Sequence, residues 1–467
     1  MRFLLDIDTQ TIYQLQNIFI EFWEWFVVLV MFMFMTLLAH RKKMMRITKE
    51  PEYKYYVWGL YAKFFASVFF VIIFYYLYKG GDTYGYFSSA MSMANLFYKD
   101  PGAYFYVLTH NHTAEAASYF DFFTGYPWGY LAQDERTYLV IKLISPLAII
   151  TKNSFLISNV ILAVITYRGS WKLFQLFYRY YHQIQFQIAL AILFMPSVLF
   201  YGSGILKDSF TFMSSALLTY YFHQLFVVRE NKFKNYFYII LHTLIIIGIK
   251  PYILMLLLPG LLIWIVFLRI NKISNKSIKI ILLPVLVAFV FAFTLLFFNT
   301  LGDAMDKFAF NKALETASIT QNDLKQDYYE GKSFDIGNFD GSALSALRLF
   351  PNATFAGLFR PFILEADSPL VLLSALENLF LLYLFLRLFF RASIKKIYKV
   401  VSSDPILIFC LFFSLFFGFM LGITTSNFGA LTRFKIPLLP FMTAGLFIIN
   451  HLLKRQQLEK ILAQIKK

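Results

Sequence analysis

One carboxylate, Asp82, follows a pair of glycines at the end of a long apolar run, in the segment KGGDTYGYF. Gly80 and Gly81 interrupt the apolar run, so Asp82 is expected to emerge where the chain leaves an apolar environment. A carboxylate at such a boundary can act as a general base or bind a divalent cation. The simpler interpretation is a solvated turn that ends a helix, because Gly-Asp is common turn chemistry.

Aromatic and acidic residues accompany Asp82 in the same polar stretch of sequence. Tyr84 and Tyr86 flank it, and their aromatic faces, if open to water, are suited to stacking on a sugar. Asp134 and Glu135 are candidates for a second catalytic acid. They directly precede an apolar segment, so the alternative is that they begin a helix, where its dipole favours negative charge.

Cations stand in four separate turns between apolar runs. The candidates for binding an anion are Lys207, Lys250, Arg360 and Arg433, with Lys435 close to the last of them. Arginine offers a planar fork for two phosphate oxygens and lysine a point charge, so this set suits a phosphate or pyrophosphate. The alternatives are anchoring at lipid headgroups and, for Arg360, an ion pair with Glu365 or Asp367.

The amino-acid composition indicates the environment in which the candidate acids and cations lie. The chain has 467 residues, of which 59% are hydrophobic, 20% aromatic and only 15% charged. This is outside the range of soluble domains and predicts one transmembrane domain over residues 1–467. The net charge of +16 comes from Lys and Arg scattered between the apolar runs rather than gathered in one face. We therefore expect a lipid bilayer as partner and no nucleic acid.

The spacing of the apolar runs predicts an all-α, polytopic protein with about eleven transmembrane helices. The expected spans are 17–39, 55–78, 154–178, 188–203, 208–228, 236–249, 252–269, 278–299, 368–390, 405–424 and 434–453. Lys250 and Pro251 separate the sixth and seventh spans, so we expect a hairpin there rather than one continuous helix.

Every alternate loop is rich in Lys and Arg, including the tail at residues 454–467. By the positive-inside rule these loops are cytoplasmic, with the amino terminus outside, the carboxyl terminus inside and a bacterial inner membrane as the expected location. Two long segments, 79–153 and 300–367, then lie outside and are expected to carry interfacial helices. The candidate cations also lie outside, against the usual charge bias, which favours an anionic ligand at the outer face.

Two segments resemble the GT-C superfamily of polytopic membrane glycosyltransferases. In that family an acid follows an early transmembrane helix, as Asp82 does in GGDTYGYF, although here it follows the second expected helix instead of the first. RFKIPLLPF resembles the family's Arg-Tyr-x-x-Pro-x-x-Pro run, with Phe434 in place of tyrosine.

The resemblance implies transfer of a sugar from a polyprenyl-phosphate carrier to a glycan, lipid or protein acceptor outside the cytoplasm. Asp82 would be the general base, with Asp134 or Glu135 as second acid, and the cations would neutralise the departing phosphate. No cofactor is required by the sequence and no metal site is predicted, although Asp82 could hold a divalent cation.

Two other functions remain open from the sequence. The chain also resembles O-antigen or exopolysaccharide repeat-unit polymerases, which rely mainly on arginines. A transporter or flippase of lipid-linked substrates would instead need ionisable residues deep within the spans, for which His242 is a candidate.

Overall fold

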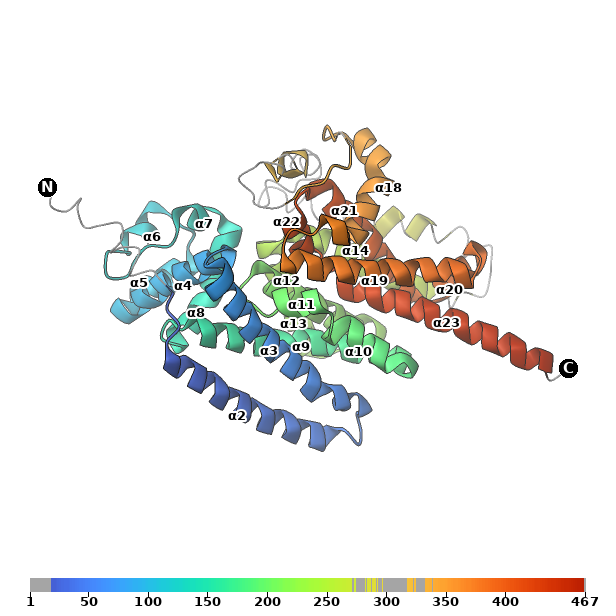
Figure 1. The fold of residues 1–467 in the computed structure, drawn as a ribbon, viewed down its shortest axis with the longest axis horizontal. Helices are drawn as coiled ribbons and strands as arrows, with labels where there is room; N and C mark the ends of the chain where they lie inside the picture. Colours follow the sequence, from blue (N-terminus) through green and yellow to red (C-terminus); the bar gives the residue numbers. More distant parts are fainter. Residues whose placement is uncertain are drawn as a thin grey trace. The chain divides into compact units, whose positions relative to one another are not determined.

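Helices make up nearly all of the regular structure in this computed structural model (Figure 1). The structure describes residues 18–270, 332–337 and 339–465, together with scattered positions between 273 and 324. Across these residues there is no strand longer than a single antiparallel bridge, between Ser333 and Asn427. The predicted all-α class is confirmed.

The chain divides into two compact units. Unit 1 consists of Met1–Trp171, Leu199–Met213 and Gly248–Lys250. Unit 2 consists of Lys172–Val198, Ser214–Ile247 and Pro251–Lys467.

Unit 1 contains two long apolar helices followed by a group of shorter ones. Its helices are α2 (Phe22–Arg46), α3 (Tyr56–Ile72) with the π-helical turn η3 (Ile73–Tyr78), α4 (Asp82–Lys99), α5 (Pro101–Thr109), α6 (Ala114–Ser118), α7 (Gly129–Gln133), α8 (Glu135–Ile150) and the first part of α9 (Phe155–Tyr181). Asp100, Thr113 and Asp134 start α5, α6 and α8 by accepting a backbone N–H with their side chains. These caps explain why a polar stretch breaks into several short helices.

Unit 2 holds most of the remaining helices. They are α10 (Gln185–Leu193), α14 (Pro251–Ile270), α18 (Ala343–Phe359), α19 (Pro369–Arg391), α20 (Ile394–Ser403), α21 (Pro405–Thr424), α22 (Phe428–Phe434) and α23 (Leu439–Ile465). Three further helices, α11 (Pro196–Tyr201), α12 (Lys207–Phe222) and α13 (Phe233–Ile249), contribute residues to both units.

Five helices are long and apolar enough to cross a membrane: Phe22–Arg46, Pro51–Tyr78, Pro251–Ile270, Pro369–Arg391 and Pro405–Thr424. Two sharply bent pairs, one around residues 151–154 and one around 435–438, raise the number to seven if each pair is one span. These helices indicate an integral membrane protein, as predicted. The expected span 278–299 lies almost entirely outside the described residues, and the helices expected at 188–203, 208–228 and 236–249 do not qualify individually.

Helix α18 differs from the expectation that segment 300–367 forms only an outer loop with interfacial helices. It packs along the candidate span α21, and the two helices run side by side in Figure 1. Small residues permit this approach: a Cβ on Gly357 would collide with the carbonyl of Gly418, and one on Gly422 would collide with that of Ala353. Close contact through small residues is the usual way for helices to associate in lipid.

The parts of α12 and α13 that belong to unit 2 run antiparallel to each other. Tyr221 stacks on Tyr238 with ring centroids 4.6 Å apart, and His242 Nδ1 lies 3.2 Å from the hydroxyl of Ser214. Helix α13 ends at Ile249 and α14 begins at Pro251, so the predicted break at Lys250 is confirmed.

Candidate functional site

Asp82 is the first residue of α4 and is exposed. The apolar helix before it ends in the turn η3, after which Lys79 adopts a left-handed conformation and Gly81 has φ of +90°. Glycine tolerates that φ at no steric cost, which lets the chain reverse sharply and start a new helix. The first turn of a helix carries partial positive charge, which favours an acidic residue such as Asp82 at this position.

Asp134 lies at the amino terminus of the next long helix of unit 1 and binds a lysine. Its carboxylate accepts hydrogen bonds from the backbone N–H of Thr137, at 3.2 Å, and from the Thr137 hydroxyl. Lys207 Nζ lies 3.2 Å from Asp134 Oδ2 and donates to Thr137 Oγ1 at 2.5 Å. The predicted helix-starting role of Asp134 is therefore real, and it coexists with an ion pair.

Charges around Lys207 link it to Asp82 as well. Burial lowers the pKa of the Lys207 ammonium, while the carboxylates of Asp134 and Asp82 act in the opposite direction. Burial also disfavours ionisation of Asp134, but hydrogen bonds from Thr137 and the charge of Lys207 outweigh it, so the pKa of that carboxyl lies below its ordinary value. The pKa of the exposed Tyr130 is raised by partial burial and then by Asp82. Asp82, Tyr130 and Lys207 therefore share one electrostatic environment.

A buried ion pair lies on the other side of Lys207. Lys250 Nζ is 2.5 Å from Asp208 Oδ1, and the Asp208 side chain is 0% exposed. Lys250 carries like charge and is close enough to Lys207 to lower its pKa. The break between α13 and α14 places Lys250 there, and the first turn of α12 places Asp208 there.

The turn before α12 is fixed by buried polar groups. Lys63, in the middle of the candidate span Pro51–Tyr78, donates to the carbonyl of Gly202. Asn159 accepts from the N–H of Ile205 at 2.9 Å, and Ser209 donates to the carbonyl of Gly204 at 2.6 Å. The turn thus holds Lys207 and Asp208 in a defined orientation.

We call these five side chains the acid–lysine cluster: Asp82, Asp134, Lys207, Asp208 and Lys250. They come from four separate segments of the chain and belong to unit 1. Four of them are predicted site residues, whereas Asp208 is not. The adjacent pair Lys207-Asp208 at the start of an apolar segment is the signal that could have identified it.

The predicted site residues beside Asp82 and Asp134 differ in how far they are exposed. Tyr86 is 4% exposed, so the expectation that its ring is open to water is wrong. Its helix faces α8 along its length, which buries that side. Tyr84 is half-buried against Phe155, with centroids 5.6 Å apart. Glu135 is exposed and accepts a hydrogen bond from Asn111 at 2.7 Å.

Arg360, in unit 2, has a carboxylate partner. Its guanidinium donates to both oxygens of Glu365, with Nε at 3.0 and 3.2 Å. It also lies over the rings of Phe334 and Phe428, at 4.7 and 5.2 Å from their centroids. The predicted alternative, a structural ion pair with Glu365, is the arrangement observed. Asp367 instead accepts the backbone N–H of Lys332.

Lys435 is fully buried and serves the fold. Its ammonium donates to the carbonyls of Leu358 and Arg360 and to the side-chain oxygen of Asn378. An ammonium has three donors, and these contacts use all of them in this structure, so the binding of a phosphate by Lys435 stays a prediction. Arg433 lies two residues earlier, half-buried in the last turn of α22.

The arrangement defines an all-α membrane protein with an acid–lysine cluster. Within the described ranges, no three or more His, Cys, Asp or Glu side chains gather closely enough to hold a metal ion. Comparison with protein-family models, with curated proteins and with solved structures finds no match for this chain.

Proposed function

We propose that the protein is a membrane glycosyltransferase that moves a sugar from a polyprenyl-phosphate donor to an acceptor at the extracytoplasmic face. The observation that carries the proposal is the convergence of Asp82, Asp134, Lys207 and Lys250 from segments far apart in the sequence. Convergence of residues with the types that such a transfer needs is better support than any of the short motifs alone.

The proposed chemistry assigns roles to Asp82 and to the two lysines of the cluster. Asp82, exposed at a helix start, takes the proton from the acceptor hydroxyl as that oxygen attacks the anomeric carbon of the sugar. The bond from that carbon to the phosphate oxygen breaks, with inversion, and negative charge develops on the phosphate. Lys207 and Lys250, which also pair with Asp134 and Asp208, stabilise this charge, because charged donors act strongly on a developing anion.

The cluster also supports one part of the proposed topology, the placement of its segments on the same side of the membrane. All four segments that meet in it were expected on the same side of the membrane. The antiparallel pair α12 and α13 leaves the cluster at Lys207 and returns to it at Lys250, as a membrane hairpin would.

The test is a mass-spectrometric profile of lipid-linked glycans in cells that carry wild-type protein or Asp82→Asn. We expect the variant to reduce transfer by roughly 10²–10⁴-fold, the usual contribution of a general base, and to accumulate an unspent lipid-linked monosaccharide. Glu115→Gln is the matched control, since it removes an exposed carboxylate of the same segment outside the cluster. Normal transfer by Asp82→Asn would show that Asp82 is not the general base and that KGGDTYGYF is only a turn that ends a helix.

A transporter of lipid-linked substrates is the second candidate, and one observation favours it. Lys63 and Glu377 are buried within candidate spans, where ionisable residues usually have a function. Each has a structural partner, Gly202 O for Lys63 and the N–H of Ser197 for Glu377. Flux of an intact lipid-linked sugar in proteoliposomes, without transfer, would reverse the order of the two candidates.

A repeat-unit polymerase that relies on arginines has less support. Its expected residues include Arg360, whose guanidinium is engaged by Glu365 and by two aromatic rings.

A further inference from the structure

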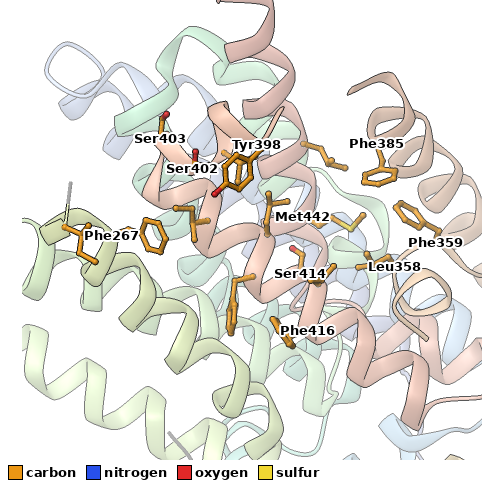
Figure 2. Close-up of a pocket in the computed structure, with 17 residues that line it drawn as sticks. Phe267, Leu358, Phe359, Phe385, Tyr398, Ser402, Ser403, Ser414, Phe416 and Met442 are labelled. Atoms are coloured by element: carbon orange, nitrogen blue, oxygen red, sulfur yellow. The ribbon is translucent and has the colours of Figure 1, made fainter. Parts of the chain in front are cut away.

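Unit 2 contains a large apolar cavity (Figure 2). Its volume is about 1010 Å³, at the upper end of the range for small-molecule pockets. Figure 2 shows Phe359 and Phe385 at one side, Met442 and Ser414 near the middle, and Tyr398, Ser402 and Ser403 at another side. The wall is mostly hydrocarbon and aromatic, and the hydroxyls of these serines and the tyrosine are its main polar groups.

One wall of the cavity is α20, the connection between two candidate spans. It begins three residues after α19 ends at Arg391 and stops two residues before α21 starts at Pro405. A helix that links the ends of two spans lies at the surface of the bilayer.

Helix α20 has the composition of a membrane-surface helix. Lys395, Lys396 and Lys399 are exposed along one side. Ile394 and Tyr398, on another side, are each 72% exposed despite being apolar or aromatic. Basic residues beside exposed apolar ones are typical of helices that lie in the interface of anionic membranes.

Helix α20 carries the exposed lysines and also contributes to the wall of the apolar cavity. Tyr398, Val401, Ser402 and Ser403 of α20 line the cavity, and the lysines occupy the same helix. A ligand that satisfies both must carry negative charge at one end and a long apolar body at the other.

We propose that this feature binds an anionic phospholipid, with its headgroup on the lysines of α20 and an acyl chain in the cavity. Charge complementarity selects the headgroup, and the apolar wall excludes a free anion, which would lose its hydration there without replacement. The lipid site shares no residue with the acid–lysine cluster. A test of lipid binding therefore does not depend on the proposed transfer reaction.

The experiment is native mass spectrometry of the full-length protein in detergent, doped with equal amounts of phosphatidylglycerol and phosphatidylcholine. We expect the wild type to retain phosphatidylglycerol preferentially. The triple variant K395Q/K396Q/K399Q is expected to lose that preference by on the order of a hundredfold at low ionic strength, since each lysine near a lipid surface contributes several-fold.

A matched control removes the same charge elsewhere. R229Q/K232Q/K234Q replaces three exposed cations of another basic loop and is expected to keep the preference. A further variant, Ser402→Phe, keeps all charges but narrows the cavity and is expected to reduce retention of both lipids. Equal retention of the two lipids by wild type, equal losses in the two triple variants, or unchanged retention by Ser402→Phe would each overturn the proposal.

Discussion

Asp208 and Lys250 form the most deeply buried part of the acid–lysine cluster. Both were removed from water when the chain folded, and each depends on the other for charge compensation. The desolvation cost of such a pair is high, so its retention is weak evidence of a gain in stability. Its presence beside Lys207 therefore suits a functional role better than a purely structural one.

A double-mutant cycle tests this pairing. Asp208→Asn and Lys250→Met are each expected to lower the free energy of unfolding by about 3–5 kcal/mol, because each removes one partner of a buried ion pair. The double variant should lose much less than the sum. Unfolding in a denaturing detergent, followed by tryptophan fluorescence, measures all four proteins. Additive losses would show that the two side chains do not interact.

Asp134 gives the cluster a pH dependence. The folded-state pKa of this carboxyl lies below its ordinary value of 3.8, so its ionised form contributes stability that is fully present above that pH. The contribution is lost as the pH falls below 3.8 through the folded-state pKa. We expect the melting temperature of wild type to exceed that of Asp134→Asn at pH 6, and the difference to shrink below pH 3.8. Thermal melts of both proteins across this pH range measure the difference. A difference in melting temperature that does not change with pH would refute the contribution of the Asp134 carboxylate.

At the scale of elements, the contact of α18 with α21 depends on glycine. Any side chain at Gly357 meets the backbone of α21 rather than a movable side chain, so the helices must separate to accept it. Separation of packed helices in lipid loses van der Waals contact along their whole length.

Gly357→Ala is therefore expected to destabilise the protein by roughly 1–3 kcal/mol, the usual cost of overpacking. Gly129→Ala is the control, because a Cβ there meets nothing within 4 Å. The two variants are compared by the same detergent unfolding. Equal stability of both would mean that α18 and α21 do not pack as closely as described.

Two buried lysines bind backbone carbonyls at or just after the ends of helices. Lys435 binds carbonyls at the end of α18, and Lys63 binds a carbonyl just after α11. The last carbonyls of a helix have no partner within it and attract a cation. In an apolar environment a lysine thus replaces the water that would bind these carbonyls at a protein surface.

At the scale of the molecule, the acid–lysine cluster constrains the topology. In the proposed topology an even number of crossings separates the turns at Asp82, Lys207 and Lys250. That is the condition under which their side chains lie on the same side of a membrane.

Cysteine labelling tests which side is outside. In a Cys410→Ser background, which removes the only native thiol, a membrane-impermeant maleimide on intact cells should label Tyr130→Cys but neither Lys232→Cys nor Lys396→Cys. All three should react after permeabilisation. Labelling of Lys232→Cys in intact cells would invert the proposed orientation.

The sequence alone determined the properties that depend on local composition. Apolar runs and the distribution of Lys and Arg predict an all-α membrane protein, because lipid requires helices to satisfy their own backbone. Gly80, Gly81 and Pro251 mark breaks that the structure confirms. These features need no knowledge of distant contacts.

Only the tertiary structure decided what each charged residue does. Lys207, Lys250 and Lys435 look alike in sequence, each a cation in a turn between apolar runs. Long-range contacts separate them: Asp134 pairs with the first, Asp208 with the second, and backbone carbonyls with the third. A charge in an apolar protein is defined by the group that compensates it, and that group lies far away in the sequence.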